Sequence, residues 1–136
     1  MNEHVDAMLG AGTFAVVGAS TNREKYGYIA YADLKRYGKT VYPVNPRATE
    51  IDGDRCYASV RELPVVPEVV VAVVPSKLTE ALVGELAEIG VRNVWMQPGA
   101  ESAKAIADAE AAGLNVTANG PCVMVGLRTM GFRKGS

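Results

Sequence analysis

The stretch from Phe14 to Lys25 constrains the fold of this chain more than any other part of the sequence. Four apolar residues, Phe14 to Val17, end at Gly18 and pass directly into small, polar and basic residues before a helical pattern begins. This pattern is typical of a buried parallel strand that feeds a ligand-binding turn. Gly18 permits a tight bend, and the helix that follows presents unpaired backbone amides. With the positive charge of Arg23 and Lys25, the turn predicts a phosphate or pyrophosphate site, and a nucleotide as ligand.

Apolar strand patterns alternate with amphipathic helix patterns along the rest of the chain. We expect strands at 14–17, 39–44, 69–74, 93–96 and 114–117. Helices are expected within residues 1–12, at 28–37, near 59–63, at 76–89 and at 102–113. The order predicts an α/β fold: a doubly wound, mostly parallel five-stranded sheet with helices on both faces, which is Rossmann-like.

Several details of these helices can be predicted from single residues. Gly38 sits where a left-handed residue ends a helix, and Ser76 and Ser102 are suited to the N-cap position. A leucine-rich stripe is expected to bury one face of the helix at 76–89: Leu78, Leu82, Leu86 and Ile89. Near the C-terminus, the apolar run Val123–Val125 suggests a surface for self-association or for a protein partner. The basic segment 127–136 is expected to be a flexible tail unless it docks on such a partner.

Length and composition limit the remaining possibilities. The 136 residues suit a single domain, and the formal net charge of −1 gives no broad basic face for nucleic acid. Cys56 and Cys122 are too few for a disulfide framework, and residues 1–12 do not read as a signal peptide, so a cytoplasmic protein is expected. The apolar run Val69–Val74 is far shorter than the roughly 20 residues that span a membrane, so no membrane association is expected.

In a parallel sheet of this kind, ligands bind beyond the carboxyl ends of the strands. The segments that follow the first four strands should therefore converge: Gly18–Lys25, Asn45–Arg47, Pro75–Lys77 and Gln97–Gly99. Gly18 is not followed by the second and third glycines of the Gly-x-Gly-x-x-Gly fingerprint, which disfavours a plain NAD site. The second strand is followed by Arg47 rather than by an acid that would bind ribose hydroxyls. Arg47 suits a phosphorylated adenosine, which leaves NADP, with its 2′-phosphate, and CoA, with its 3′-phosphate, both open.

Several motifs, taken in order, resemble the small single-domain CoA-binding protein family. They are Val16-Val17-Gly18-Ala19-Ser20, Tyr42-Pro43-Val44-Asn45-Pro46-Arg47, Val73-Val74-Pro75, Val94-Trp95-Met96-Gln97-Pro98-Gly99 and Asn119-Gly120-Pro121-Cys122. That family is similar to the N-terminal CoA-binding domain of the succinyl-CoA synthetase α-subunit. The resemblance covers about residues 12 to 126, nearly the whole chain.

The resemblance implies that CoA lies across the strand ends. Its diphosphate would lie on the turn Ser20–Arg23, its 3′-phosphate near Arg47, and its pantetheine along Pro75 and Met96–Pro98. The synthetase also uses a phosphohistidine domain and a partner subunit that this sequence lacks, so ligase activity is not implied. The contact residues expected are Gly18, Ala19, Ser20, Thr21, Asn22, Arg23, Lys25, Asn45, Pro46, Arg47, Val74, Pro75, Met96, Gln97, Pro98 and Gly99.

Some of these residues also have simpler interpretations. Asn45 and Pro46 are common in turns whatever is bound, and Gln97 could contact either the pantetheine amides or a neighbouring turn. Cys122 could form a mixed disulfide with the CoA thiol, or be a small buried apolar residue. The single histidine, His4, stands in an expected N-terminal helix without a second metal ligand type nearby. We therefore expect no catalytic residues and no metal site.

Two classes of function follow from these observations. The first is a non-enzymatic carrier, sensor or regulatory module that binds CoA or an acyl-CoA. The alternative is an enzyme, either an NADP-binding reductase or an accessory subunit of an acyl-CoA ligase, with catalytic residues supplied by another chain. Neither involves nucleic acid, and a small homo-oligomer or a protein partner is compatible with both.

Overall fold

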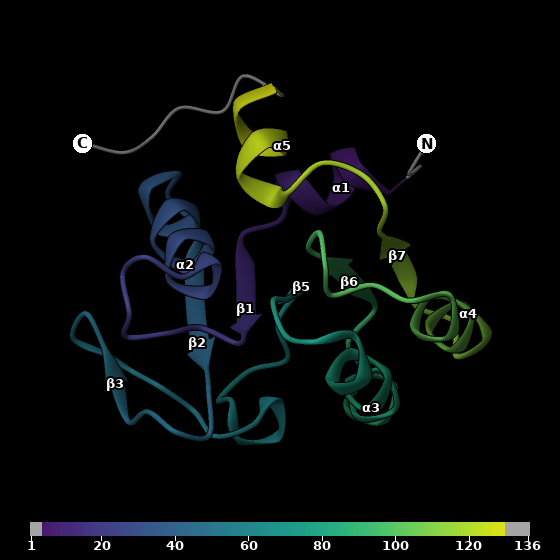
Figure 1. Ribbon diagram of the computed structural model, residues 1–136, viewed down its shortest axis with the longest axis horizontal. Helices are drawn as coiled ribbons and strands as arrows, with labels where there is room; N and C mark the ends of the chain where they lie inside the picture. The colour runs from purple at the N-terminus through teal and green to yellow at the C-terminus, as the bar shows by residue number, and fades with distance from the viewer. Residues whose placement is uncertain (1–3, 130–136) are drawn as a thin grey trace.

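Five parallel strands form the centre of the molecule in the computed structural model, which describes residues 4–129 (Figure 1). The strands lie side by side in the order β2-β1-β5-β6-β7, so the chain crosses from one side of β1 to the other. All four neighbouring pairs are parallel, which confirms the predicted fold class. The strands are β1 (Thr13–Val17), β2 (Thr40–Val44), β5 (Val69–Ala72), β6 (Asn93–Met96) and β7 (Asn115–Thr117).

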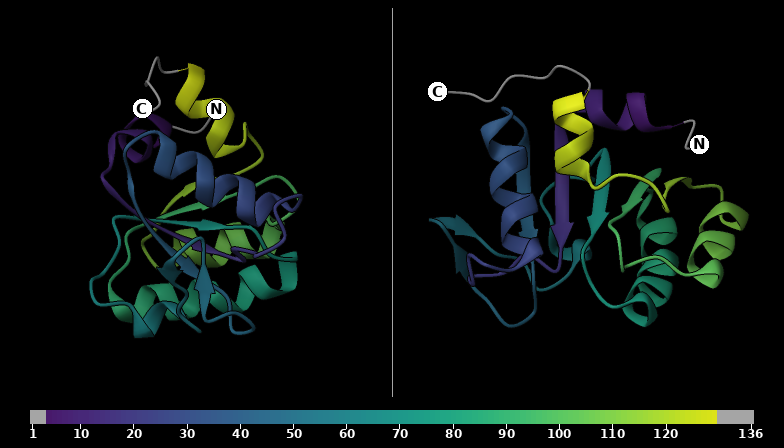
Figure 2. Two further views of the ribbon diagram at one scale, coloured as in Figure 1. Left: turned by 90° about the vertical axis from the view of Figure 1, so that its left-hand side faces the viewer. Right: turned by 45° about the horizontal axis from the view of Figure 1, so that its top comes forward.

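Helices cover both faces of the sheet (Figure 2). On one face lie α1 (Val5–Gly10), α2 (Tyr26–Arg36) and α5 (Val123–Thr129), and on the other lie α3 (Ser76–Ile89) and α4 (Ala103–Ala111). Successive strand residues point to opposite faces, so Phe14 and Val16 belong to the core under α2, whereas Ala15 belongs to the core under α3. Trp95 belongs to the core under α2 and is fully buried.

Strand β5 is buried on both faces, as its continuous apolar sequence predicts. It ends at Ala72, two residues before the predicted end at Val74. The Val73 amide still bonds to the Val17 carbonyl at 2.8 Å, and the chain then turns toward Pro75. Val73 and Val74 therefore leave the sheet at its carboxyl edge, where they are available to a ligand.

The helix ends confirm two capping predictions and correct a third. Gly38 has a φ of +84° and follows α2, and the Ser102 hydroxyl accepts a hydrogen bond from the Ala105 amide at 3.0 Å. Ser76, however, is the first residue of α3 and makes no capping bond, because Pro75 occupies the N-cap position. The prediction that Ser76 caps this helix is wrong.

The buried face of α3 differs from the predicted leucine stripe. Thr79, Val83 and Leu86 are the buried residues, whereas Leu78 is 57% exposed. Of the predicted stripe, Leu86 is buried, and Leu82 and Ile89 are partly buried against the core. Leu78 and Leu82 also line a cavity. The apolar residues of α3 thus contact both the core and the cavity, and the sequence pattern alone does not distinguish these two surfaces.

Two elements were not predicted. The first is a small antiparallel hairpin, β3 (Glu50–Ile51) and β4 (Asp54–Arg55), which turns at Asp52-Gly53. The 3₁₀ helix Val60–Glu62 that follows it lies at the place expected for a short helix. The second unpredicted element is α5.

Helix α5 corrects the expectations for the C-terminal segment. Val123, Met124 and Leu127 are buried in it, so the run Val123–Val125 is mainly core, and the surface for self-association expected there is wrong for its first two residues. The expected flexible tail, 127–136, begins inside α5, and residues 130–136 lie outside the described part of the chain. Between residues 4 and 129, no helix combines the length and apolar character that crossing a membrane would require.

Candidate functional site

The carboxyl edge of the sheet contains a crevice where the strand order reverses, between β1 and β5. The turns that follow these two strands are in direct contact. A Cβ atom on Gly18, whose φ is +97°, would lie 2.2 Å from the Val73 carbonyl oxygen. The Gly18 amide bonds to the Val44 carbonyl at 2.9 Å, which ties the turn to β2 as well. Glycine is therefore required at position 18, as the sequence predicts.

Gly27, in the first turn of α2, is a second required glycine that sequence reasoning missed. A Cβ atom there would lie 1.9 Å from the Gly18 carbonyl oxygen, so only glycine lets the helix begin this close to the turn. In the dinucleotide fingerprint, the third glycine provides this close packing of helix and strand. The chain thus meets the same steric need nine residues after Gly18, outside the spacing of that motif. A glycine in the first turn of an expected helix was the available signal.

The amino end of α2 opens onto the first of three cavities, which we call the turn cavity. It measures about 430 Å³ and is lined by Gly18, Ser20, Glu24, Lys25, Tyr26, Gly27, Asn45 and Val73. Within residues 4–129, no hydrogen-bond acceptor is found for the backbone amides of Tyr26 and Gly27. Lys25 occupies the N-cap position and provides no side-chain cap. These amides and the positive end of the helix dipole favour an anion in the turn cavity.

Polar side chains of the turn maintain its shape through internal hydrogen bonds. The Ser20 hydroxyl accepts a bond from the Asn22 amide, and the Asn22 side-chain oxygen accepts one from the Glu24 amide, both at 3.0 Å. Asn45 donates its side-chain NH₂ to the Ala19 carbonyl at 2.7 Å and accepts the Arg47 amide at 2.8 Å. Asn45 therefore joins the ends of β1 and β2, which favours its interpretation as a turn residue.

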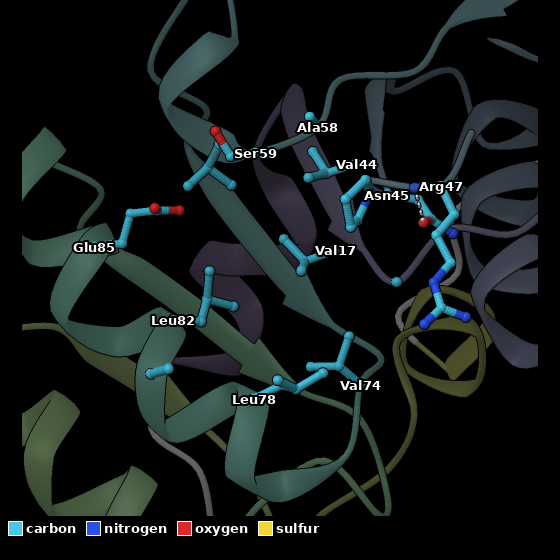
Figure 3. Close-up of a pocket in the computed structure, with 14 residues that line it drawn as sticks. Val17, Val44, Asn45, Arg47, Ala58, Ser59, Val74, Leu78, Leu82 and Glu85 are labelled. Carbon is cyan, nitrogen blue, oxygen red and sulfur yellow. Dashed lines mark hydrogen bonds between the residues drawn. The ribbon is translucent and has the colours of Figure 1, made fainter. Parts of the chain in front are cut away.

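The second cavity lies between the end of β2 and helix α3, and we call it the α3 cavity (Figure 3). It measures about 480 Å³, and most of its lining side chains are aliphatic, including Val17, Val44, Val60, Val74, Leu78 and Leu82. Arg47 lies at its rim, and within the described residues no carboxylate forms a salt bridge with it. On the opposite side, Glu85 is paired with Arg61 at 3.2 Å. The cavity thus offers an apolar floor with one available cation.

The third cavity, the α5 cavity, lies between the turns after β5 and β6 and the segment that leads into α5. It measures about 550 Å³ and has no charged side chain in its lining, which comprises Tyr26, Val73, Val74, Pro75, Gln97, Pro98, Gly99, Ala100, Gly120, Pro121 and Cys122. Gln97 is only 3% exposed, and its side-chain oxygen accepts the Val123 amide at 2.8 Å. Its contact with the start of α5 agrees with the neighbouring-turn interpretation. Its NH₂ group has no hydrogen-bond acceptor within residues 4–129.

The three cavities adjoin one another, because each shares lining residues with its neighbours. Gly18 and Asn45 line both the α3 and turn cavities, and Tyr26 and Val73 line both the turn and α5 cavities. Val74 separates the α3 cavity from the α5 cavity and lines both. The crevice therefore suits an elongated ligand with an anionic middle, one apolar end beside a cation and one uncharged end.

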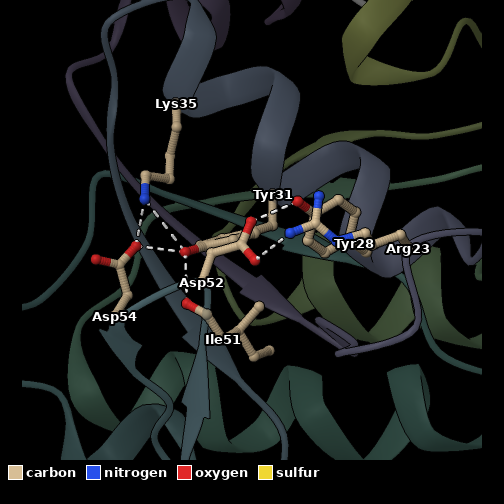
Figure 4. A network of polar contacts seen from close by, with 7 residues as sticks. All are labelled: Arg23, Tyr28, Tyr31, Lys35, Ile51, Asp52 and Asp54. Atoms are coloured by element: carbon tan, nitrogen blue, oxygen red, sulfur yellow. Dashed lines mark hydrogen bonds and ion pairs between the residues drawn. The ribbon is translucent and has the colours of Figure 1, made fainter.

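Arg23 lies outside these cavities. Its guanidinium pairs with the Asp52 carboxylate at 3.2 Å and stacks 5.2 Å above the Tyr28 ring (Figure 4). The Tyr28 hydroxyl donates to the same carboxylate, and this hydrogen bond raises the pKa of Tyr28 above its ordinary value. Arg23 therefore connects α2 to the β3–β4 hairpin in this structure, instead of contacting the anion position for which it was predicted.

A second group of contacts fixes the same hairpin to α2 (Figure 4). The Tyr31 hydroxyl donates to the Asp54 carboxylate, which also accepts a bond from Lys35 at 2.6 Å. Burial, and then this hydrogen bond, raise the pKa of Tyr31. Burial alone would raise the pKa of Asp54, but the bonds from Lys35 and Tyr31 lower it. The hairpin is thus held to α2 by two carboxylates, one on each side of Gly53.

Most of the predicted site residues meet at the crevice. Those that line a cavity are Gly18, Ser20, Lys25, Asn45, Pro46, Arg47, Val74, Pro75, Gln97, Pro98, Gly99 and Cys122. The predicted residues that do not are Ala19, Thr21, Asn22, Arg23 and Met96, of which Ala19 and Met96 are buried in the core. Sequence reasoning missed Tyr26, Gly27, Val73, Leu78 and Leu82. Within the described chain, no group of three or more His, Cys, Asp or Glu residues is arranged to hold a metal ion.

Comparison with known proteins shows what this chain is similar to. The family model described as "CoA binding domain" matches residues 12–128. Among curated proteins, the chain is 42% identical over 81 residues to the "Acetate--CoA ligase [ADP-forming] II subunit alpha" of Pyrococcus furiosus. This match covers 59% of this chain and 18% of that protein.

Solved structures of similar size match over most of their length. A conserved hypothetical protein from Pyrococcus furiosus is 45% identical, with a TM-score of 0.80, over 84% of this chain and 97% of that one. A hypothetical protein from Pyrococcus horikoshii is 35% identical, with a TM-score of 0.88, over 95% of this chain and 91% of that one. The chain therefore resembles small whole proteins as well as one part of a larger ligase subunit.

Proposed function

We propose a function from the premise that this chain belongs to the CoA-binding domain family: it binds CoA or an acyl-CoA in the crevice, as a non-enzymatic carrier, sensor or regulatory module. The observation that supports the proposal is the arrangement of the three adjoining cavities. CoA consists of a 3′-phosphorylated adenosine, a diphosphate and an uncharged pantetheine arm, in that sequence. The α3, turn and α5 cavities offer matching surroundings in the same sequence.

The diphosphate is assigned to the turn cavity. The unpaired amides of Tyr26 and Gly27 are suited to its oxygens, and Lys25 adds positive charge. Glu24 also lines this cavity, so the backbone amides must outweigh one nearby carboxylate. Arg23 is not needed in this arrangement, because its charge is already paired with Asp52.

The adenosine is assigned to the α3 cavity and its 3′-phosphate to Arg47. The exposed face of Leu78 and the side chain of Leu82 give an adenine ring an apolar surface to pack on. The guanidinium of Arg47 lies at the rim, where a phosphate on the ribose can reach it without being buried. NADP presents its phosphate at the ribose 2′ position, and its other half would place a charged nicotinamide in the uncharged α5 cavity.

A second candidate function is that of an accessory domain for an acyl-CoA ligase. The curated relatives include several ADP-forming acetate–CoA ligases, and the matches cover only 18% and 21% of two ligase α-subunits from Pyrococcus furiosus. Tyr26, which lines the α5 cavity, is 68% exposed, and Ile29, three residues further along α2, is 37% exposed. A catalytic chain that docks there would meet the thiol end of the ligand. Size-exclusion chromatography with candidate ligase chains, with and without CoA, tests this candidate.

Thermal unfolding with four ligands tests the assignment of Arg47. A ligand that binds only the folded state, present at about 100 times its Kd, stabilises it by about 2.7 kcal/mol, or roughly 10 °C in Tm for a domain of this size. We expect CoA to raise Tm more than dephospho-CoA, NADP or NAD. Arg47→Ala should remove the difference between CoA and dephospho-CoA.

The matched control is Arg92→Ala, because Arg92 is exposed and precedes β6 at the opposite edge of the sheet. This variant should retain the preference for CoA. An unchanged preference in Arg47→Ala would refute the 3′-phosphate assignment, and a larger shift with NADP than with CoA would overturn the proposed ligand.

A further inference from the structure

We propose that Cys122 is a covalent attachment site for CoA, which it takes from a CoA disulfide to form a mixed disulfide. This inference rests on the proposed function, because it places the pantetheine arm in the α5 cavity. It goes beyond that function by assigning a reversible redox modification to one side chain. CoA disulfides, in which the CoA sulfur is joined to a second thiol, are the substrate class.

The backbone around Cys122 is held in place at the wall of the cavity. The Cys122 carbonyl accepts a bond from the Gly126 amide at 3.0 Å, and the Pro121 carbonyl accepts the Trp95 ring N–H at 3.3 Å. Trp95 is fully buried, so this contact fixes the segment to the core. Cys122 itself is partly exposed and lines the α5 cavity, so its sulfur is accessible from the ligand side.

Gln97 provides an independent indication that a polar ligand enters this cavity. The residue is only 3% exposed, and it lines the same cavity as Cys122. Its oxygen is fixed by the Val123 amide at 2.8 Å, so its NH₂ group must point elsewhere. No acceptor for that group is found in the described part of the chain. Within the described residues, Thr79 Oγ1 is the fully buried side-chain polar atom without a partner, so the Gln97 NH₂ group is reachable from the cavity that Gln97 lines. An amide carbonyl of a pantetheine arm can accept a hydrogen bond from it there.

Cys122 lines the cavity into which the pantetheine arm would extend. The turn cavity, which we assign to the diphosphate, joins the α5 cavity at Tyr26 and Val73. The lining of the α5 cavity also includes Cys122, Pro98, Gly99 and Gly120, none of which lines the turn cavity. An arm that starts at the turn cavity and runs through this space brings its terminal sulfur to the same compartment as the Cys122 thiol.

Cys56 differs from Cys122 in each of these respects. It is only 6% exposed, lines none of the three cavities and donates its thiol to the Asn45 carbonyl at 3.6 Å. Burial raises the pKa of Cys56, which lowers the fraction of reactive thiolate. The chain therefore contains a matched unreactive cysteine for comparison.

The chemical step is a thiol–disulfide exchange and needs no external oxidant. Cys122 loses its proton to solvent, and the thiolate attacks the CoA sulfur of the disulfide. A new bond forms between the Cys122 Sγ and the CoA sulfur, while the original S–S bond breaks. The second thiol leaves as a thiolate and takes up a proton, so that one disulfide and one thiol are present before and after the step.

Intact-mass spectrometry of the full chain incubated with the symmetric CoA disulfide tests this proposal. We expect a mass gain of one CoA less two hydrogen atoms, the release of one equivalent of free CoA, and reversal by a reducing agent. Cys122→Ser should abolish the adduct, and Cys56→Ser should retain it. The disulfide cystamine, which lacks the nucleotide, should react with Cys122 at least about tenfold more slowly, because it gains nothing from the crevice.

The outcomes separate this inference from the function on which it rests. If CoA stabilises Cys122→Ser as it stabilises the wild type, but the wild type forms no adduct, the covalent site is refuted and CoA binding stands. Equal rates with cystamine and the CoA disulfide would reduce Cys122 to an ordinary exposed thiol and refute the site. If CoA stabilises neither protein and no adduct forms, both the proposed function and the covalent site fail.

Discussion

At the scale of the residue, the site depends on a glycine that no ligand-binding motif identifies. Gly27 allows α2 to start against the carbonyl of Gly18, and an added Cβ atom would lie 1.9 Å from that oxygen. Since both partners belong to the backbone, no side-chain rotation relieves the clash. We expect Gly27→Ala to lower the free energy of unfolding by about 2–3 kcal/mol and to weaken CoA binding, because α2 must move away from the anion position.

Gly84, in the interior of α3, is the matched control for this prediction. An added Cβ atom there meets no atom within 4 Å, apart from its own helix backbone. Gly84→Ala should therefore be neutral or stabilising, by up to about 1 kcal/mol. Chemical denaturation of the two variants measures both effects. A Gly27→Ala protein as stable as Gly84→Ala would contradict the close approach of the helix and the turn.

At the scale of the element, Glu68 connects the start of β5 to the start of β1. Its carboxylate accepts bonds from the Thr13 hydroxyl at 2.8 Å and from the Gly12 and Thr13 amides at 3.0 Å. The Thr13 hydroxyl bond, followed by the two amide bonds, lowers the pKa of Glu68 below its ordinary value. The stabilisation is therefore complete above the pKa of the unfolded chain, about 4.3, and is lost as the pH falls through the lower pKa of the folded state.

Glu68→Gln tests this connection. The variant should be less stable than the wild type at pH 7, by no more than about 1 kcal/mol, because the carboxylate is exposed to solvent. The difference should shrink as the pH is lowered below about 4. Denaturant unfolding across that range measures it, with Glu110→Gln on the exposed side of α4 as a control that should show no such trend. A stability difference that does not change with pH would show that the charge of Glu68 has no part in the connection.

The elements that the sequence predicts well are those whose residue pattern has a single cause. Strand β5 is apolar throughout because both of its faces are covered, and Gly38 ends α2 because the chain there needs a positive φ. Prediction fails where one pattern serves two purposes. In α3, Leu86 of the predicted stripe is buried in the core, whereas Leu78 faces the cavity, and a stripe read for burial alone does not reveal this second surface. The apolar residues of α5 could equally have formed an exposed patch.

At the site, the parallel topology makes it predictable that the segments after the strands lie together, whereas the directions of individual side chains could not be predicted. Because all five strands run the same way, the segments after them must share one edge of the sheet, and most of the predicted residues do line the crevice there. Arg23 is the clearest exception. Its pairing with Asp52 depends on the β3–β4 hairpin, which was not predicted.

At the scale of the whole molecule, we propose that a single CoA lies along three adjoining cavities that the strand order brings together. Residues from the turns after β1, β2, β5 and β6 form one crevice only because β2 and β5 flank β1. The anion position lies in the middle of the crevice, with an apolar cavity on one side and an uncharged cavity on the other. Binding should therefore need the whole CoA molecule rather than its nucleotide alone.

Calorimetric titration of the full chain with CoA, with NADP in parallel, tests this claim most directly. We predict saturable binding of one CoA per chain, with an affinity at least about tenfold higher than that for NADP, a difference of about 1.4 kcal/mol. Equal or tighter binding of NADP, or no saturable heat with CoA, would contradict the account.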